Sequence, residues 1–202
     1  EAMECEDSAQ WHEAMQKEIN SLEDNGTWKL VDTLPEGANV IDCKWVYKVK
    51  MDERGNVERF KARLTAKGFK QIEGIDFFET FALVVKFKSL RVVLTIVVIN
   101  GMECIQLDVD TAYLNSLLYE LIYMRLPKGH KHAGRIVQLL KVIYGLKQGG
   151  RRWNETFHDY ATSIGFVQCP SDPCVYTRGK SQNADFAILA IYVDDILLAV
   201  NT

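Results

Sequence analysis

The first apolar residues of the chain recur at the spacing of one helix face. Four of them lie three or four positions apart: Trp11, Met15, Ile19 and Leu22. An α-helix brings such positions onto one side. Ser8 precedes this run as a candidate cap, and Asn25-Gly26 follows it as a stop. The pattern predicts an amphipathic helix within residues 1–27, with its acidic face in solvent.

An alternation of apolar and basic residues then predicts a β-hairpin. From Cys43 to Met51, apolar residues alternate with lysines, and residues 52–56 have the composition of a turn. The next segment alternates apolar residues with a basic set: Arg59, Lys61, Arg63 and Lys67. Because alternate residues of a strand point to opposite faces, the hairpin presents one basic face. A basic face that only meets solvent is the alternative interpretation.

An apolar run and a short alternating run occupy the middle of the chain. Ser89 to Asn100 is apolar on most sides and ends before Gly101, which predicts a buried helix, with a strand as the alternative. Farther along, apolar residues alternate with polar ones that include Asp108 and Asp110. This alternation predicts a half-buried strand with two carboxylates on its other face. We expect Thr111 to Leu118 to turn into a helix.

The end of the chain predicts a buried hairpin. Phe186 to Val193 is fully apolar, Asp194-Asp195 follows, and Ile196 to Val200 is apolar again. A two-residue turn favours Gly or Asn because it needs positive φ. Two aspartates at the turn therefore indicate backbone strain, which suggests a functional role for the turn. The most loop-like segments are Pro127 to Gly134 and Arg178 to Asp185.

The aspartates suit a metal site. Adjacent carboxylates repel each other unless a hard divalent cation neutralises them. Asp108 ends its strand just before a chain reversal, so we expect it beside the hairpin in one sheet. Three such aspartates can hold two magnesium ions about 3.5–4 Å apart, a geometry that suits nucleotidyl transfer. For each aspartate taken alone, an ordinary polar turn or an exposed strand residue is the alternative.

Composition adds a charge asymmetry. The net charge of -3 argues weakly against a nucleic-acid partner, but Lys44 to Lys70 and Lys128 to Arg152 are two strongly basic zones that can line one anionic partner. The five cysteines, Cys5 among them, include no Cys-x-x-Cys pair. No signal peptide opens the sequence, and no apolar run reaches membrane length. We expect reduced thiols and a cytoplasmic or nuclear protein that is not secreted.

Several blocks of the sequence resemble copia-type retrotransposon reverse transcriptases. Tyr192-Val193-Asp194-Asp195, between apolar runs, is similar to the signature of reverse transcriptases. Gln106-Leu107-Asp108-Val109, with Ala112-Tyr113-Leu114-Asn115, is similar to their first catalytic motif. Further blocks match in order along nearly the whole chain: Lys44-Trp45-Val46-Tyr47-Lys48, Lys61-Ala62-Arg63-Leu64, Ala66-Lys67-Gly68-Phe69, Gly74-Ile75-Asp76-Phe77, Glu79-Thr80-Phe81-Ala82 and Tyr144-Gly145-Leu146-Lys147-Gln148.

The resemblance implies a fold. It is an α+β right-hand polymerase palm, an antiparallel sheet with helices on one face, together with a fingers lobe and without a thumb. Residues 1–202 would form one incomplete reverse transcriptase domain. Residues 1–27 would hold the N-terminal helix, residues 28–87 mainly fingers, and residues 88–202 mainly palm with part of the fingers.

The resemblance also implies an activity, RNA-directed DNA polymerase, which adds nucleotides to a primer 3′-hydroxyl by a two-metal mechanism. The metals would be two magnesium ions, with manganese as a substitute. Their ligands would be Asp108, Val109, Asp194 and Asp195, of which the three aspartates are catalytic. The substrate-binding residues would be Lys61 and Arg63 at the triphosphate, with Thr111, Ala112, Tyr113 and Gln148. The nucleic-acid-binding residues would be Lys147, Arg151, Arg152 and Tyr192.

By the same resemblance, Tyr113 would stack under the deoxyribose and exclude a 2′-hydroxyl, with plain core packing as the alternative. The partners would be a primed RNA or DNA template, deoxynucleoside triphosphates, and the integrase, ribonuclease H and protease of a longer Pol polyprotein. The setting would be a cytoplasmic virus-like particle or the nucleus, with no membrane.

Some positions depart from the family pattern. Leu83 and Val142 replace prolines, Ser116 replaces a glycine, and Gly149-Gly150 replaces Ala-Pro. Glycine in place of proline raises the entropy of ordering a loop by about 1 kcal/mol or less. With the chain ending at Thr202, three hypotheses follow: a weakly processive polymerase, a nucleic-acid-binding module without catalysis, or an inert remnant that still folds.

Overall fold

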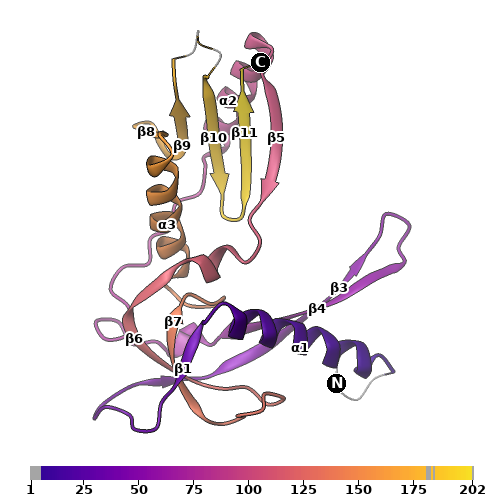
Figure 1. Ribbon diagram of the computed structural model, residues 1–202, viewed down its shortest axis with the longest axis vertical. Helices are drawn as coiled ribbons and strands as arrows, with labels where there is room; N and C mark the ends of the chain where they lie inside the picture. The colour runs from indigo at the N-terminus through magenta and orange to yellow at the C-terminus, as the bar shows by residue number, and fades with distance from the viewer. Residues whose placement is uncertain (1–5, 181–182, 184, 202) are drawn as a thin grey trace. The chain divides into compact units, whose positions relative to one another are not determined.

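The computed structural model describes residues 6–180, 183 and 185–201 (Figure 1). The chain forms two compact units, each built from two separate segments. Unit 1 comprises Glu1–Thr80 and Ser116–Gly149, and unit 2 comprises Phe81–Asn115 and Gly150–Thr202. Both units contain helix and sheet. The expected α+β class is therefore confirmed, although the chain crosses between its two units three times.

Unit 1 contains a four-stranded sheet in the order β1-β7-β6-β2. Its strands are β1 (Trp28–Leu30), β7 (Ile136–Lys141), β6 (Leu117–Arg125) and β2 (Val40–Ile41). The strand β2 runs parallel to β6, and the other pairs are antiparallel. The loop predicted over Pro127 to Gly134 lies between β6 and β7. Fully buried aliphatic residues from these strands form the core, among them Ile41, Ile122, Met124, Val137 and Leu139.

The predicted N-terminal helix and hairpin also lie in unit 1. Helix α1 (Ser8–Asp24) buries Trp11, Ala14, Met15, Ile19 and Leu22, as its spacing predicts. It packs on a hairpin of β3 (Cys43–Met51) and β4 (Val57–Ala66). The expectation that Ser8 caps the helix is wrong, because Ser8 is its first residue and Asp7 takes the cap position without a side-chain hydrogen bond. A 3-10 turn, η1 (Gly68–Lys70), follows the hairpin.

Unit 2 is built on a five-stranded antiparallel sheet in the order β5-β11-β10-β9-β8. The strands are β5 (Glu103–Asp108), β8 (Val167–Cys169), β9 (Asp172–Arg178), β10 (Ala187–Tyr192) and β11 (Asp195–Val200). The helices are α2 (Phe87–Asn100) and α3 (Gly149–Ser163). A 3-10 helix, η2 (Ala112–Asn115), follows β5. The predicted apolar hairpin is β10–β11, and five of the six residues of β10 are buried.

The two helices contact different residues of this sheet. Phe157 and His158 of α3 contact the ring of Tyr176. Residues of α2 line a groove with Ala190 and Leu197. Tyr176 is opposite Leu189 in the register, so it points to the face away from Ala190 and Leu197. The helices therefore lie against opposite faces, whereas the resemblance implies helices on one face.

Three predictions about the middle of the chain need correction. Helix α2 forms and Gly101 ends it with φ 62°, but it is not buried: Val98 is 80% exposed and Ile99 76%, because only one side of the helix meets the core. Strand β5 is exposed along its whole length rather than half-buried, because it is an edge strand that, among the described strands, pairs with β11 alone. The helix expected over Thr111 to Leu118 is only the short η2, and β6 begins at Leu117.

The segment Arg178 to Asp185, predicted as a loop, falls partly outside the described residues, as does Cys5. The other four cysteines carry free thiols. Among the described residues, no helix combines the length and the apolar character that a membrane span requires.

Candidate active site

Two of the predicted aspartates lie side by side at the end of the unit 2 sheet. Asp108, the last residue of β5, is directly opposite Asp195, the first residue of β11. Residues opposite each other in a ladder point to the same face. Asp194 lies in the adjoining turn, and its carbonyl oxygen accepts a hydrogen bond of 2.9 Å from the Val109 N–H. The expectation that Asp108 lies beside the hairpin in one sheet is confirmed.

The position of the turn differs from the prediction by one residue. Tyr192 pairs with Asp195, so the two turn residues are Val193 and Asp194, not Asp194 and Asp195. Val193 has φ 58°, and Asp194 is not among the residues with positive φ. This pattern is that of a type II′ turn, in which glycine is favoured at the first position. The strain therefore falls on a β-branched residue, for which positive φ is unusual.

A second strained residue lies close to the carboxylates in the chain. Among the described residues, Thr111 (φ 52°) and Val193 are the only non-glycine positions with positive φ. Thr111 leads into η2, which carries Ala112 and Tyr113. Burial first, and then the Asp194 carboxylate, raise the pKa of the Tyr113 hydroxyl. Strained backbone tends to persist where a site requires it, so both residues make this region a candidate functional site.

Trp153 is a residue that the sequence patterns did not single out. Its indole Nε1–H donates a hydrogen bond of 2.6 Å to the carbonyl oxygen of Val193. The side chain is 4% exposed and packs against the ring of Phe157. In the sequence, Trp153 reads only as an apolar residue of a helix, so no local signal connects it to a turn 40 residues away.

The carboxylates have the donor type that magnesium prefers, because hard divalent cations bind carboxylate and carbonyl oxygens. One oxygen of Asp195 accepts a hydrogen bond of 2.9 Å from the Gln106 side-chain amide. Within the described part of the chain, no three His, Cys, Asp or Glu side chains are grouped closely enough to hold a metal ion. The observed arrangement is one opposed pair of aspartates with a third in the turn.

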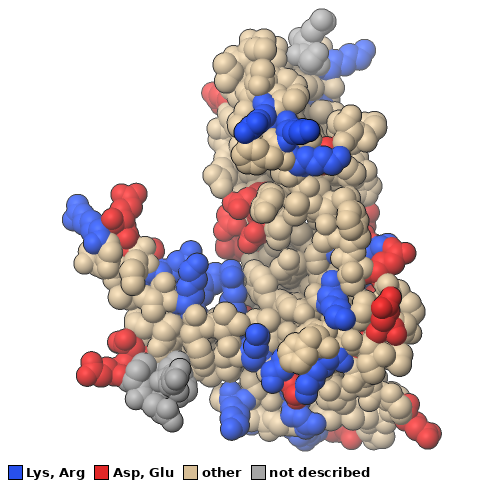
Figure 2. Space-filling view, turned by 180° about the vertical axis from the view of Figure 1, so that it is seen from behind, with Lys and Arg blue, Asp and Glu red and all other residues tan. Residues whose placement is uncertain are grey.

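The basic face predicted for the β3–β4 hairpin is present in unit 1. Lys48 is opposite Lys61, and Lys50 is opposite Arg59. The apolar residues of β4 that alternate with them, Ala62, Leu64 and Ala66, are buried. Figure 2 shows Lys and Arg side chains gathered along this hairpin. The prediction of one basic and one apolar face is confirmed.

Burial and neighbouring charges act on this face. Burial first, and then the positive charges of Arg63, Arg59 and Lys50, lower the pKa of Lys61. The guanidinium of Arg63 lies 4.6 Å from the centre of the Tyr144 ring, a cation–π contact. A Glu18 carboxylate oxygen accepts a hydrogen bond of 3.0 Å from the Leu64 N–H, and burial raises the pKa of Glu18. Like Trp153, Glu18 was not predicted as part of the site.

Gln148 is held by unit 1 itself. Its side chain is buried. The amide nitrogen donates a hydrogen bond of 2.8 Å to the Asp76 carbonyl oxygen, and the amide oxygen accepts one of 3.0 Å from the Gln71 side-chain amide. The other oxygen of this network, Gln71 Oε1, accepts the Lys147 N–H. The Lys147 ammonium lies 4.3 Å from the centre of the Phe77 ring. Both polar groups of the Gln148 amide are thus engaged within the protein.

The remaining predicted residues lie in unit 2. Arg151 and Arg152 both pair with Glu155 at 2.8 Å on α3. Burial acts against ionisation of Glu155, but the hydrogen bonds from the two arginines outweigh it and lower its pKa. Tyr192 is 55% exposed at the end of β10, next to the turn. It lines an apolar groove of about 530 Å³ with Asp195 and residues of α2.

The departures from the family pattern make specific contacts. The Leu83 N–H donates a hydrogen bond of 2.7 Å to Asn154 Oδ1. The Val142 N–H donates one of 2.9 Å to the Ser116 carbonyl oxygen. Proline has no N–H, so neither bond can form with the usual residue. Gly149 and Gly150 begin α3 rather than a loop. A side chain at Gly150 would meet Ala82 Cβ at 2.6 Å, so this glycine lies in close contact.

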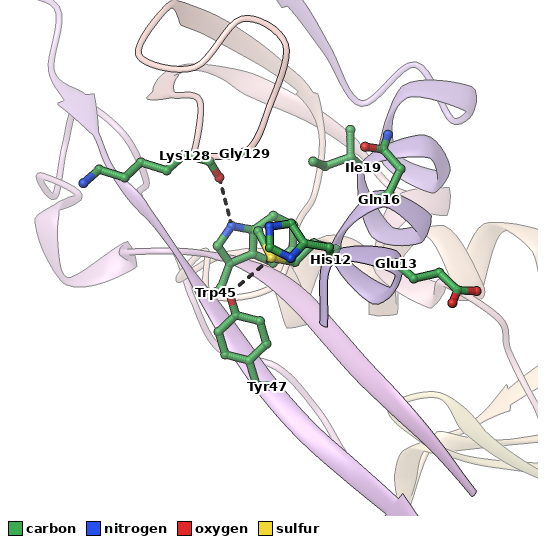
Figure 3. A pocket seen from close by; sticks show the side chains of 9 residues that line it. His12, Glu13, Gln16, Ile19, Trp45, Tyr47, Lys128 and Gly129 are labelled. Atoms are coloured by element: carbon green, nitrogen blue, oxygen red, sulfur yellow. Dashed lines mark hydrogen bonds between the residues drawn. The ribbon is translucent and has the colours of Figure 1, made fainter. Parts of the chain in front are cut away.

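A separate pocket of about 640 Å³ lies in unit 1 between α1, β3 and the β6–β7 loop (Figure 3). Trp45 Nε1 donates to the Lys128 carbonyl oxygen at 3.4 Å, and the Tyr47 hydroxyl donates to Met15 Sδ at 3.3 Å. In Figure 3 the side chains of Glu13 and Lys128 point away from the aromatic rings. The pocket is therefore mainly part of the apolar packing interface between α1 and the β3–β4 hairpin.

Comparison with known proteins gives consistent matches. A family model described as reverse transcriptase (RNA-dependent DNA polymerase) matches residues 25–202. The chain is 46% identical over 188 residues to the retrovirus-related Pol polyprotein from transposon TNT 1-94 of Nicotiana tabacum, covering 92% of the chain and 14% of that protein. It is 39% identical over 196 residues to the Pol polyprotein from transposon RE1 of Arabidopsis thaliana, covering 95% of the chain and 13% of that protein. It thus spans about one seventh of these relatives.

Proposed function

The chain belongs to the reverse transcriptase family of copia-type transposon Pol polyproteins, and from this premise we propose that it is a polymerase core that extends a primer on an RNA template. The observation that carries the proposal is the register of β5 and β11, which sets Asp108 opposite Asp195 beside the strained turn of Asp194. Unit 2 would be the palm and unit 1 the fingers.

In this proposal Asp108, Asp194, Asp195 and the Val109 carbonyl would hold magnesium, or manganese in its place. When bound, the two ions would lower the pKa of the attacking primer hydroxyl and stabilise the leaving oxygen. The carboxylates are of the hard oxygen type that this role requires. The opposed pair would supply two of the three carboxylates, and Asp194 in the adjoining turn would supply the third.

The other residues would bind and orient the nucleotide. Lys61 and Arg63 on the basic hairpin would neutralise its triphosphate, with Arg63 oriented by Tyr144. Thr111, Ala112 and Tyr113 would form the sugar side of the pocket. Gln148 would have a positioning role. Its amide is hydrogen-bonded within unit 1, so it would hold the loop that carries Lys147 in place.

Lys147, Arg151, Arg152 and Tyr192 would contact the template and primer. Contacts to phosphate give affinity without sequence preference and weaken with salt. The partners would include deoxynucleoside triphosphates and the remaining parts of a Pol polyprotein, because the relatives are longer proteins of that name. The setting would be the cytoplasm or the nucleus.

A magnesium-dependent primer extension assay on an RNA template tests the proposal. The parent chain is compared with Asp194→Asn and with Asp159→Asn, an exposed carboxylate on α3 as matched control. Loss of a metal-binding carboxylate should reduce incorporation at least about 100-fold, and the control should match the parent. Equal incorporation by the parent and Asp194→Asn would refute catalysis by this site.

The second candidate function is a nucleic-acid-binding module that no longer catalyses. The basic face of the β3–β4 hairpin, where Lys48 is opposite Lys61 and Lys50 is opposite Arg59, favours it because this face can bind a polyanion whether or not the carboxylates hold a metal. In that case primed template should bind in a salt-sensitive way, and binding should be the same in Asp194→Asn. Binding that does not respond to salt would exclude this function and leave a folded remnant.

A further inference from the structure

The turn that carries Asp194 is strained and needs support from outside the hairpin. Val193 has φ 58° at the turn position where glycine is favoured. A free β10–β11 hairpin with this sequence would tend to relax towards another turn, because strained backbone persists only where its surroundings over-determine it. Relaxation would move Asp194 relative to Asp108 and Asp195.

Two hydrogen bonds reach the turn from other elements of unit 2. The Val109 N–H donates to the Asp194 carbonyl oxygen at 2.9 Å. The Trp153 indole N–H donates to the Val193 carbonyl oxygen at 2.6 Å. The first comes from the residue that follows Asp108, and the second comes from α3. The strained peptide between Val193 and Asp194 is therefore held at its own carbonyl by Trp153.

Trp153 is well placed to hold a fixed position. It is 4% exposed, and its ring packs with Phe157 in the core of unit 2. An indole has one donor and no acceptor, so a buried indole loses a hydrogen bond unless a carbonyl lies in front of it. The Val193 carbonyl supplies that acceptor. Packing orients the indole, and the indole orients the turn.

We propose that Trp153 is a positioning residue for the carboxylates: its indole N–H clamps the strained Val193 turn and so holds Asp194 next to Asp108 and Asp195. This inference rests on the proposed function only in taking these aspartates as cation ligands. The clamp acts through the backbone, so Trp153 itself contacts no metal. Partners that orient metal ligands typically change metal affinity about 10- to 100-fold when they are removed.

The test is manganese binding, followed by the electron paramagnetic resonance signal of free Mn²⁺. Trp153→Phe keeps the aromatic packing and removes the donor, and it should weaken Mn²⁺ binding about 10- to 100-fold. Val193→Gly removes the strain and should bind within about threefold of the parent. The double variant Trp153→Phe with Val193→Gly should recover most of the lost affinity, since a relaxed turn needs no clamp.

The variant Asp194→Asn distinguishes failure of the proposed metal site from failure of the Trp153 clamp. If it binds Mn²⁺ as tightly as the parent, the proposed metal site is wrong whatever Trp153 does. If it binds weakly while Trp153→Phe binds like the parent, the clamp is wrong and the site stands. A double variant that stays as weak as Trp153→Phe would also overturn the clamp, because a purely structural tryptophan predicts no rescue.

A second measurement guards against a variant that does not fold. In the ¹⁵N-labelled parent chain, the Trp153 indole N–H, identified by its loss in Trp153→Phe, should exchange slowly with solvent. In Val193→Gly it should exchange as slowly as in the parent, because glycine favours the same turn and leaves the acceptor carbonyl in place. An indole proton of the parent that exchanges as fast as an exposed one would overturn the proposal.

Discussion

The β3–β4 and β10–β11 hairpins close their turns by different means. The β3–β4 hairpin closes through residues 52–56, in which Gly55 takes φ 81° and Asp52 accepts hydrogen bonds from the backbone N–H groups of Arg54 and Asn56. The β10–β11 hairpin closes through Val193 and Asp194, with the positive φ on valine. The first turn satisfies itself locally, and the second is supported by Trp153 and Val109.

The difference follows from what each hairpin presents. The basic hairpin presents side chains along its length, so its turn is free to use the residues that turn most easily. The β10–β11 hairpin presents Asp194 at its turn, where the positive φ falls on Val193, a β-branched residue that disfavours it. A turn that holds Asp194 in one position thus requires tertiary support, and that support lies far away in the sequence.

The largest expected effect is on the reaction rate of two thiols, one in each unit. Burial first, and then the Asp42 charge, raise the pKa of Cys43 on β3 to about 11. Burial first, and then Asp172, raise the pKa of Cys174 on β9 to about 11. Since the thiolate is the reactive form, both should react about 100-fold more slowly with iodoacetamide at pH 8 than an unperturbed thiol.

Cys104 on the edge strand β5 is exposed and should be labelled first. Mass spectrometry of timed samples in a Cys5→Ser background gives the order. Equal rates for Cys43 and Cys104 would show that the start of the basic hairpin opens as freely as the sheet edge of unit 2.

The second prediction concerns a buried carboxylate that supports unit 2. Asp172 accepts a hydrogen bond from the Lys86 N–H at the start of α2. Burial acts to raise its pKa, but hydrogen bonds from Ser89, Lys86 and Cys174 outweigh it, and the pKa is lowered. Asp172→Asn should reduce the free energy of unfolding by about 1–3 kcal/mol at neutral pH.

The sign of the pH dependence follows from the lowered pKa. The contribution of Asp172 is fully present above the unfolded pKa of about 3.9 and is lost as the pH falls through the lower folded value. The stability difference between the parent and Asp172→Asn should therefore be constant above about pH 5 and shrink in stronger acid. Urea titrations from pH 3 to 7, with Asp159→Asn as control, measure it. A difference that grows on acidification would contradict this account.

The third prediction tests whether the basic hairpin binds a polyanion. Lys61→Ala should weaken binding of primed template by up to about tenfold at low salt and reduce the slope of log affinity against log salt by about 1. Lys17 on α1 is paired with Glu13 and largely exposed, so Lys17→Ala is the control. Fluorescence anisotropy over a salt series gives both quantities. The same slope in the two variants would indicate that the basic face only meets solvent.

The smallest expected effect compares the two turns directly. Gly55→Ala should lower the free energy of unfolding by about 1 kcal/mol, because alanine disfavours the left-handed region that Gly55 occupies. Val193→Gly should leave stability unchanged or raise it by less than about 1 kcal/mol, because relief of strain offsets the added chain entropy. Chemical denaturation measures both. A loss in Val193→Gly as large as that in Gly55→Ala would remove the contrast between the turns.

Much of the candidate site was readable from local pattern. The alternation around Lys61 predicted the basic face, and the apolar runs around Asp194 predicted the β10–β11 hairpin. The turn itself was predicted one residue too late, because turn chemistry favours aspartate over valine at positive φ. Trp153 and Glu18 were missed because each acts on a backbone group 40 or more residues away.

Local pattern was enough to predict most helices and strands and the side chains that could carry the chemistry, since periods of 2 and 3.6 are local properties. The pairing of Asp108 with Asp195, the exposure of α2 and β5, and the strain at Val193 became apparent only in the folded chain. Register, exposure and support for a strained turn depend on which surfaces meet when the chain folds. No local sequence pattern specifies which surfaces these are.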